Sequence, residues 1–322
     1  MPVKRLVVLH RGVLPPNAEW IDSAVDTRYV TEEELPAALP GADALLAWHP
    51  MSRAVAGAWP AGPAAPRWIH VAASGVEPML FPAVTHDPDV VVTNSRGVYE
   101  RAIAEYVLGF VLAMAKDLPG MLEHQQRGEW RPRDSEPIGG RGVLVWGTGP
   151  IGRAIARMLR AVGMGACGGG RGPVDGDPDF GTVHGPATLH AALGDADYVV
   201  LAAPLTAQTR GMVDARAIAA MKPGARLINV GRGALVDEEA LIDALAHGHL
   251  TGAALDVFAT EPLPAESPLW SMPGVIVSPH TAGEVHGWRQ SLADLFAANL
   301  RRYQSGRPLL NVIDKTRGYV AT

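Results

Sequence analysis

The chain has 322 residues, which exceeds the roughly 100 to 200 residues of one typical domain, so we expect two domains. With 48 % hydrophobic and only 19 % charged residues the composition excludes a disordered chain, and a net charge of -5 argues against a nucleic-acid partner. The single cysteine, Cys167, excludes an internal disulfide and a cysteine-rich metal site, and it favours a reducing, cytoplasmic location. The longest apolar stretch, 106–115, is about half the ~20 residues that a bilayer span needs, so we expect no membrane segment.

Short apolar, β-branched runs bounded by glycine or proline recur along the chain and predict strands. They lack polar alternation and are separated by helical patterns, which favours parallel strands buried on both faces of an α/β sheet. The nine runs span residues 6–9, 44–48, 68–71, 90–93, 143–146, 198–202, 226–230, 253–257 and 275–278. A further, glycine-rich strand is expected at 164–167.

Three segments show the pattern of helices. Residues 100–115 carry apolar side chains at helical spacing and predict a core helix that is apolar enough to be buried on more than one side. Residues 151–162 predict a second amphipathic helix. A third begins after Asp237, a residue type that caps helices, and ends before Gly248.

A glycine motif joins the strand 143–146 to the helix 151–162, which is the context that a dinucleotide-binding turn requires. We expect Gly147 to permit a tight turn, Gly149 to let backbone N–H groups approach a pyrophosphate, and Gly152 to permit close contact of helix and strand. The motif consists of Gly147, Thr148, Gly149, Pro150, Ile151 and Gly152. The sequence therefore predicts a nicotinamide or flavin dinucleotide as cofactor.

Three downstream segments closely resemble the signature regions of the D-isomer-specific 2-hydroxyacid dehydrogenases, and among them the glyoxylate/hydroxypyruvate reductases. They are residues 227–241, residues 252–258 followed by Glu261-Pro262, and residues 278–283. The resemblance implies an α/β protein with two doubly wound parallel-sheet lobes and an active site in the cleft. A Rossmann dinucleotide-binding domain, 96–287, would be inserted into a flavodoxin-like substrate domain built from 1–95 and 288–322.

Arg232 and His280 each follow a predicted strand, at the sheet edge where α/β proteins bind ligands. The guanidinium fork of Arg232 suits a planar carboxylate, and the flanking Gly231 and Gly233 would let the backbone bend sharply around it. His280 follows Pro279, a stiff residue that would fix the direction in which the backbone enters the histidine. For Glu261 an exposed loop position is the default reading from the residues alone, and only the resemblance gives it a role.

By the resemblance, a hydride passes between the nicotinamide ring and the C2 carbon of a 2-oxo acid. Arg232 would bind the carboxylate and polarise the carbonyl group, His280 would be the general acid, and Glu261 would favour its imidazolium form. A loop in the first lobe would complete the carboxylate site with its backbone N–H groups. That loop consists of Ala73, Ser74, Gly75 and Val76.

The resemblance also supplies cofactor contacts outside the glycine motif. Asp256 matches the aspartate that anchors the nicotinamide carboxamide, although an aspartate at a strand end equally suits capping of a neighbouring turn. The remaining contacts implied in this way are Pro204, Thr209, Val230, Gly231 and Gly283.

The position where NAD-selective sites carry an acidic residue is occupied by Gly170, followed by Arg171. Without a carboxylate there, a ribose 2′-phosphate can enter and pair with the Arg171 guanidinium. Asp175 is the rival acid, but it lies beyond Gly172 and Pro173. We therefore expect NADP(H) to be preferred, with NAD(H) as the other possible cofactor.

The resemblance further implies a homodimer formed largely through residues 100–130. Trp130 resembles a tryptophan that reaches the partner's active site in glyoxylate/hydroxypyruvate reductases, and the alternative is a packed surface aromatic. Some relatives are instead dinucleotide-sensing transcriptional co-repressors, so a regulatory role without physiological turnover is the other functional reading. Arg232, Glu261 and His280 together favour the enzyme. The acid itself stays open, because glyoxylate, hydroxypyruvate, pyruvate and bulkier 2-oxo acids share one carboxylate-carbonyl core.

Overall fold

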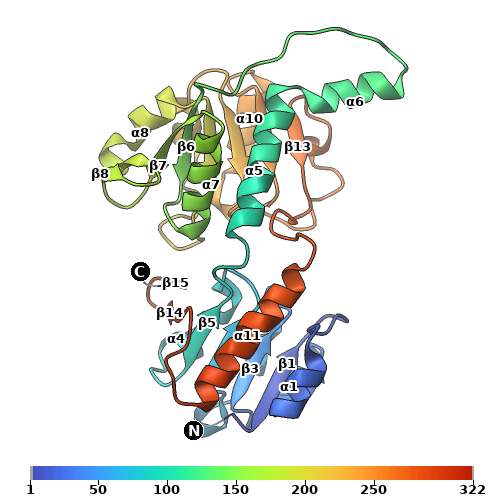
Figure 1. Ribbon diagram of the computed structural model, residues 1–322, viewed down its shortest axis with the longest axis vertical. Helices are drawn as coiled ribbons and strands as arrows, with labels where there is room; N and C mark the ends of the chain where they lie inside the picture. The colour runs from blue at the N-terminus through green and yellow to red at the C-terminus, as the bar shows by residue number, and fades with distance from the viewer. Residues whose placement is uncertain (1–2, 321–322) are drawn as a thin grey trace. The chain divides into compact units, whose positions relative to one another are not determined.

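A computed structural model describes residues 3–320, and the chain divides into two compact units (Figure 1). The first unit is built from both ends of the chain, Met1–Val98 and His286–Thr322, and the second is the intervening Tyr99–Val285. Within the described residues, no helix is both long and apolar enough to span a membrane.

The first unit is a five-stranded parallel sheet with helices on both faces. Its strands stand in the order β2-β1-β3-β4-β5, the flavodoxin-like order. Alternate residues point to opposite faces: Val7 and Ile69 join one hydrophobic cluster, and Leu6 and Trp68 join the other. The strands are β1 (Arg5–Leu9), β2 (Asp26–Val30), β3 (Ala44–Ala47), β4 (Trp68–Val71) and β5 (Val91–Asn94).

Two helices of this unit, α1 (Ala18–Ala24) and α11 (Trp288–Gln304), contribute to the cluster that contains Trp68. The Trp68 ring stacks on Phe296 of α11 at a centroid distance of 5.5 Å. The opposite face is covered by the short helices α2 (Leu35–Ala38), α3 (Ala54–Ala58) and α4 (Pro82–Thr85). A small antiparallel ladder of β14 (Ile313–Asp314) and β15 (Tyr319–Val320) follows α11 in the chain.

The second unit is an eight-stranded sheet in the order β13-β12-β11-β10-β6-β7-β9-β8. Helices α5 (Glu100–Ala115) and α7 (Pro150–Ala161) cover one face, and α8 (Pro186–Asp195), α9 (Ala215–Ala220) and α10 (Glu238–Ala246) cover the other. Helix α6 (Leu118–Gln126) follows α5. The strands are β6 (Gly142–Trp146), β7 (Gly165–Gly169), β8 (Val174–Asp177), β9 (Gly181–His184), β10 (Tyr198–Leu201), β11 (Arg226–Asn229), β12 (Gly252–Leu255) and β13 (Val275–Val277).

The two strand orders confirm the predicted α/β class with a Rossmann-type and a flavodoxin-like sheet. All nine predicted apolar strands occur, with ends that differ from the predicted ones by at most two residues. The Asp237 side chain accepts a hydrogen bond from Ala240 N at the start of α10, and Gly248 follows that helix with a φ of +73°. The helix over 100–115 has the predicted bounds.

The strands of the structure depart from the sequence prediction in several places, and β8, β9, β14 and β15 were not predicted. The glycine-rich strand lies at Gly165–Gly169 rather than 164–167, because a run that is mostly glycine has no apolar pattern to mark its ends. Strand β8 is antiparallel to β9, so the sheet is not purely parallel. Strand β2 was not predicted, because its edge position leaves alternate residues outside the core and dilutes the apolar signal.

Candidate functional site

The glycine turn between β6 and α7 has the geometry that its sequence predicts. Gly147 has a φ of +129°, and a Cβ there would lie 2.5 Å from the Ala202 carbonyl carbon. A Cβ at Gly152 would lie 1.8 Å from Gly147 O, so both positions require glycine. By contrast, a Cβ at Gly149 would meet nothing within 4 Å.

The open space at Gly149 lies at the start of a twelve-residue helix. Gly149 is the N-cap of α7, and no side chain caps the first turn. Uncapped N–H groups at the positive end of a helix, beside a position with no Cβ, form a cradle that fits a pyrophosphate. The residues of this turn therefore fit a dinucleotide.

Arg232 follows β11, which ends at Asn229, one residue earlier than predicted. Its Nη1 donates to Gly231 O at 2.7 Å, and Asn229 Nδ2 donates to Arg232 O at 3.0 Å. The backbone bends at Gly231, as predicted, although neither flanking glycine has a positive φ. A Cβ at Gly233 would lie 1.8 Å from the Phe258 carbonyl carbon, so close packing requires glycine at that position.

His280 and Glu261 form a direct pair. The distance between His280 Nδ1 and Glu261 Oε2 is 2.8 Å, and Glu261 Oε1 accepts a hydrogen bond from Phe258 N at 3.0 Å. Burial raises the pKa of the Glu261 carboxyl, but the bonds from His280 and Phe258 and the nearby Arg232 charge outweigh it, so the pKa of Glu261 is lowered. The carboxylate is therefore ionised at neutral pH. Glu261 lies in the exposed loop position expected from the residues alone, and it also faces His280, as the resemblance implies.

Asp256 follows β12 and is 2 % exposed. Its carboxylate accepts hydrogen bonds from Thr281 N at 2.9 Å and from Ala282 N at 3.0 Å. Ser278 Oγ donates a third, at 2.5 Å. Of the two readings of Asp256, the structure shows the turn-capping one, and the capped turn is the one that carries His280.

Gly170 and Arg171 directly follow β7, and Arg171 is exposed. Gly170 N donates to His184 O at 2.9 Å, which ties the loop to β9. Asp175, the rival acid, lies exposed in β8.

An unpredicted ion-pair cluster fixes the β8–β9 hairpin to α7. Arg153 donates to Asp177 Oδ2 and to Asp179 Oδ2, both at 2.9 Å. The Arg153 guanidinium holds the pKa of the Asp177 carboxyl down at about 2. Sequence spacing gives no signal for this cluster, because the arginine and the two aspartates belong to separate elements.

The loop Ala73–Val76 lies in the first unit, after β4. Asn94 Nδ2 donates to Ser74 O at 2.6 Å, and Ser95 N donates to Ala73 O at 2.9 Å. The Ser74 Oγ atom is buried and has no hydrogen-bond partner among the described residues. These hydrogen bonds hold the backbone of the loop, and the Ser74 hydroxyl takes no part in them.

Trp130 is 95 % exposed, so its reading as a packed surface aromatic is wrong. Its neighbour Glu129 lies 2.8 Å from His124 Nδ1 and 3.1 Å from Arg131 Nε. These ion pairs on both sides of the tryptophan restrain the segment that presents it.

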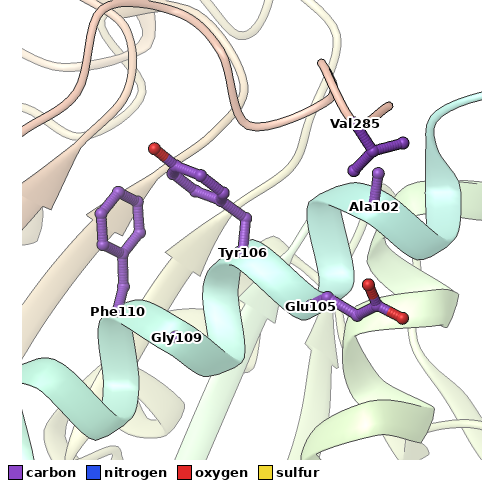
Figure 2. Close-up of a pocket in the computed structure, with 6 residues that line it drawn as sticks. All are labelled: Ala102, Glu105, Tyr106, Gly109, Phe110 and Val285. Atoms are coloured by element: carbon purple, nitrogen blue, oxygen red, sulfur yellow. The ribbon is translucent and has the colours of Figure 1, made fainter. Parts of the chain in front are cut away.

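The outer side of α5 bears an apolar depression rather than a second buried face (Figure 2). The burial of this helix on more than one side is expected in a homodimer, and it stays a prediction. The residues that line the depression are Ala102, Glu105, Tyr106, Gly109, Phe110 and Val285.

The other predicted cofactor contacts all lie in the second unit. Thr209 Oγ1 donates to Pro204 O at 2.6 Å, which closes the loop after β10. Val230 is 8 % exposed, directly after β11. A Cβ at Gly283 would lie 2.6 Å from the Tyr99 ring, so glycine is required there.

The sequence matches the family model described as "D-isomer specific 2-hydroxyacid dehydrogenase, NAD binding domain" over residues 108–282. A glyoxylate reductase of Thermococcus gammatolerans is 34 % identical over 236 residues, which cover 70 % of each chain. Glyoxylate/hydroxypyruvate reductase B of Pectobacterium carotovorum is 33 % identical over 236 residues, covering 71 % of this chain and 73 % of the relative.

Two solved structures are similar over nearly the whole chain. A D-isomer specific 2-hydroxyacid dehydrogenase from Xanthobacter autotrophicus, in complex with NADPH and MES, has a TM-score of 0.80 and 32 % identity, covering 98 % of this chain and 100 % of its own. An NADPH-dependent glyoxylate/hydroxypyruvate reductase from Sinorhizobium meliloti, in complex with NADP and sulfate, has a TM-score of 0.84 and 27 % identity at the same coverage. The likeness extends over the residues of both units.

Proposed function

Because the chain belongs to the D-isomer specific 2-hydroxyacid dehydrogenase family, we propose that it transfers a hydride between NAD(P)H and the C2 carbon of a small 2-oxo acid. The observation that carries this proposal is the pair of His280 and Glu261, joined at 2.8 Å beyond the carboxyl ends of the strands, where α/β sheets bind their ligands. Arg232 follows a neighbouring strand of the same edge.

When bound, the nicotinamide supplies the hydride. The protein must hold the acid and deliver a proton to the oxygen on C2. Arg232 binds the substrate carboxylate with its planar fork and polarises the carbonyl group. His280 is the general acid: Glu261 accepts the hydrogen bond from Nδ1, which leaves Nε2 as the atom that gives up the proton.

The ionised carboxylate of Glu261 faces the His280 ring directly, so it fixes the direction of the ring. The loop Ala73–Val76 keeps its proposed role in binding the substrate carboxylate through backbone N–H groups. The unpartnered Ser74 Oγ is a further polar atom in that loop. Glyoxylate and hydroxypyruvate are the first substrates to test, because they are named for the Pectobacterium relative.

The glycine turn Gly147–Gly152 would hold the pyrophosphate of the dinucleotide, and Asp256 would bind the carboxamide in addition to capping its turn. We propose NADP(H) as the preferred cofactor, through Arg171 and the absence of a carboxylate at Gly170. Two structural neighbours support this, since one was solved with NADPH and the other with NADP. The remaining proposed contacts are Pro204, Thr209, Val230, Gly231 and Gly283.

We also propose a homodimer in which Trp130 reaches the partner's active site. Its support is the 95 % exposure of a large apolar side chain on a restrained segment, together with the apolar depression on α5. A cytoplasmic location is likewise proposed, from the single cysteine. A mass in solution that equals one chain would contradict the dimer.

The function is tested with purified protein, NADPH and a panel of glyoxylate, hydroxypyruvate and pyruvate, by following NADPH absorbance at 340 nm. The proposal expects turnover of at least one of these acids. Tight dinucleotide binding with no turnover of any 2-oxo acid would refute the proposal and favour the regulatory reading.

A further inference from the structure

The backbone at His280 is in a conformation that its surroundings must hold. His280 has a φ of +56°, in the left-handed region that side chains other than glycine seldom occupy. Such a conformation persists only where neighbouring contacts maintain it. Here the two N–H groups that follow, from Thr281 and Ala282, both donate to the carboxylate of Asp256. The direction of the His280 ring therefore depends on where Asp256 is held.

Asp256 is in turn held by a chain of hydroxyl groups that begins on α5. Ser278 Oγ donates to Asp256 Oδ1 at 2.5 Å, and the Tyr106 hydroxyl lies 2.8 Å from Ser278 Oγ. A carboxylate only accepts hydrogen bonds, and a serine hydroxyl has one proton to give. Because that proton goes to Asp256, Tyr106 must donate to Ser278. The chain thus has one direction, from Tyr106 through Ser278 to Asp256.

Tyr106 is well placed to keep this chain aligned. Its ring packs edge-to-face on Phe110 at a centroid distance of 4.8 Å, one turn along the same helix. Figure 2 shows the ring extending away from α5 with the hydroxyl at its far end. Helix α5 is a rigid element of sixteen residues, so the position of the Tyr106 hydroxyl is held by the helix.

We propose that Tyr106 is a positioning residue for the proton donor: its hydroxyl aligns Ser278 on the Asp256 carboxylate that maintains the His280 turn. This inference rests on the proposed function of His280. If the Tyr106 hydroxyl is removed, Ser278 Oγ can turn toward Thr281 Oγ1, which lies 3.5 Å away. Asp256 then loses an aligned donor, and the His280 ring samples directions that do not favour proton transfer.

The test compares Tyr106→Phe with Tyr198→Phe. Tyr198 lies in β10 of the same unit, and its hydroxyl has no hydrogen-bond partner among the described residues, so it is a matched control. Tyr106→Phe should lower kcat by roughly threefold to tenfold, the effect of one neutral hydrogen bond, while KM for the acid changes less than twofold. Tyr198→Phe should leave both constants unchanged.

A double-mutant cycle shows whether the two hydroxyls act in one chain. Ser278→Ala alone should lower kcat at least as much as Tyr106→Phe, and the double variant should be no worse than Ser278→Ala. Independent effects that multiply in the double variant would overturn the proposal. A kcat of Tyr106→Phe equal to that of the unmodified enzyme would also overturn the proposal. The same holds if Tyr106→Phe and Tyr198→Phe lower kcat by equal factors.

A readout without turnover separates this proposal from the proposed function. The nuclear magnetic resonance signal of the His280 Cε1–H group, identified by its loss in His280→Asn, should shift or broaden in Tyr106→Phe and stay unchanged in Tyr198→Phe. An unchanged signal in Tyr106→Phe would refute the positioning role. If the protein turns over no 2-oxo acid, the proposed function is refuted. The His280 signal in Tyr106→Phe then still tests whether Tyr106 positions His280.

Discussion

The choice of nicotinamide cofactor is expected to depend on Arg171. A charge-assisted hydrogen bond to phosphate contributes about 1.5 to 3 kcal/mol, and the exposed position of Arg171 places its contact at the lower end. Since about 1.4 kcal/mol corresponds to a factor of ten, we expect a preference for NADPH over NADH of about tenfold in kcat/KM. Arg171→Ala should remove most of it. The measurement is kcat/KM for both cofactors at saturating acid and fixed ionic strength.

Gly170→Asp should shift the preference toward NADH, because a carboxylate accepts hydrogen bonds from the ribose hydroxyls and repels a 2′-phosphate. A Cβ at Gly170 would lie 3.1 Å from Val183 Cγ1 and 3.4 Å from Thr148 Cγ2, so small side-chain movements accommodate it. The control is Arg160→Ala, because Arg160 is an exposed arginine in the last turn of α7, away from the glycine turn at the start of that helix. An unmodified enzyme that prefers NADH, or an Arg171→Ala variant with an unchanged ratio, would refute the reasoning.

The remaining predictions concern the cofactor turn and the core of the first unit. Gly152→Ala should abolish dinucleotide binding, measured by fluorescence titration, because its Cβ would lie 1.8 Å from Gly147 O, whereas Gly172→Ala, with nothing within 4 Å, should bind normally. His70 is fully buried, and burial lowers its pKa to about 3, so the folded chain keeps it neutral while the unfolded chain, with a pKa near 6.5, takes up a proton as the pH falls. The free energy of unfolding of the first unit should therefore drop by about 2 kcal/mol between pH 7 and pH 5 through this group. In urea unfolding, His70→Leu should flatten the dependence of the free energy of unfolding on pH. The control is His86→Leu at an exposed histidine, which should keep that dependence. An equal drop in the free energy of unfolding from pH 7 to pH 5 in both variants would contradict the prediction.

What the sequence predicts well is local. A buried parallel strand is a short apolar run whatever it packs against, so the nine runs located nine strands. The glycine turn was equally readable, because its three glycines, strand and helix lie within about 20 residues. The Asp237 cap of α10 has the same local origin, since its partner Ala240 N is three residues away.

What the sequence could not predict depends on residues that are distant in the chain. The bond between Tyr106 and Ser278 joins positions 172 residues apart, and no periodicity connects them. The pairing of Glu261 with His280 came only from family resemblance, because a loop glutamate carries no local sign of its partner. The close packing that requires glycine at position 233 was missed for a related reason: the atoms that exclude a Cβ there belong to Phe258.

The central claim is that His280 delivers the proton in reduction of a 2-oxo acid. Its most direct test is the rate of NADPH oxidation with glyoxylate by His280→Ala, measured beside NADPH binding by the same protein. Loss of a positioned proton donor typically costs about 10² to 10⁴ in rate, so kcat should fall by that factor while the Kd for NADPH stays within about threefold. A His280→Ala variant that turns over glyoxylate, hydroxypyruvate or pyruvate at the unmodified rate would contradict the mechanism.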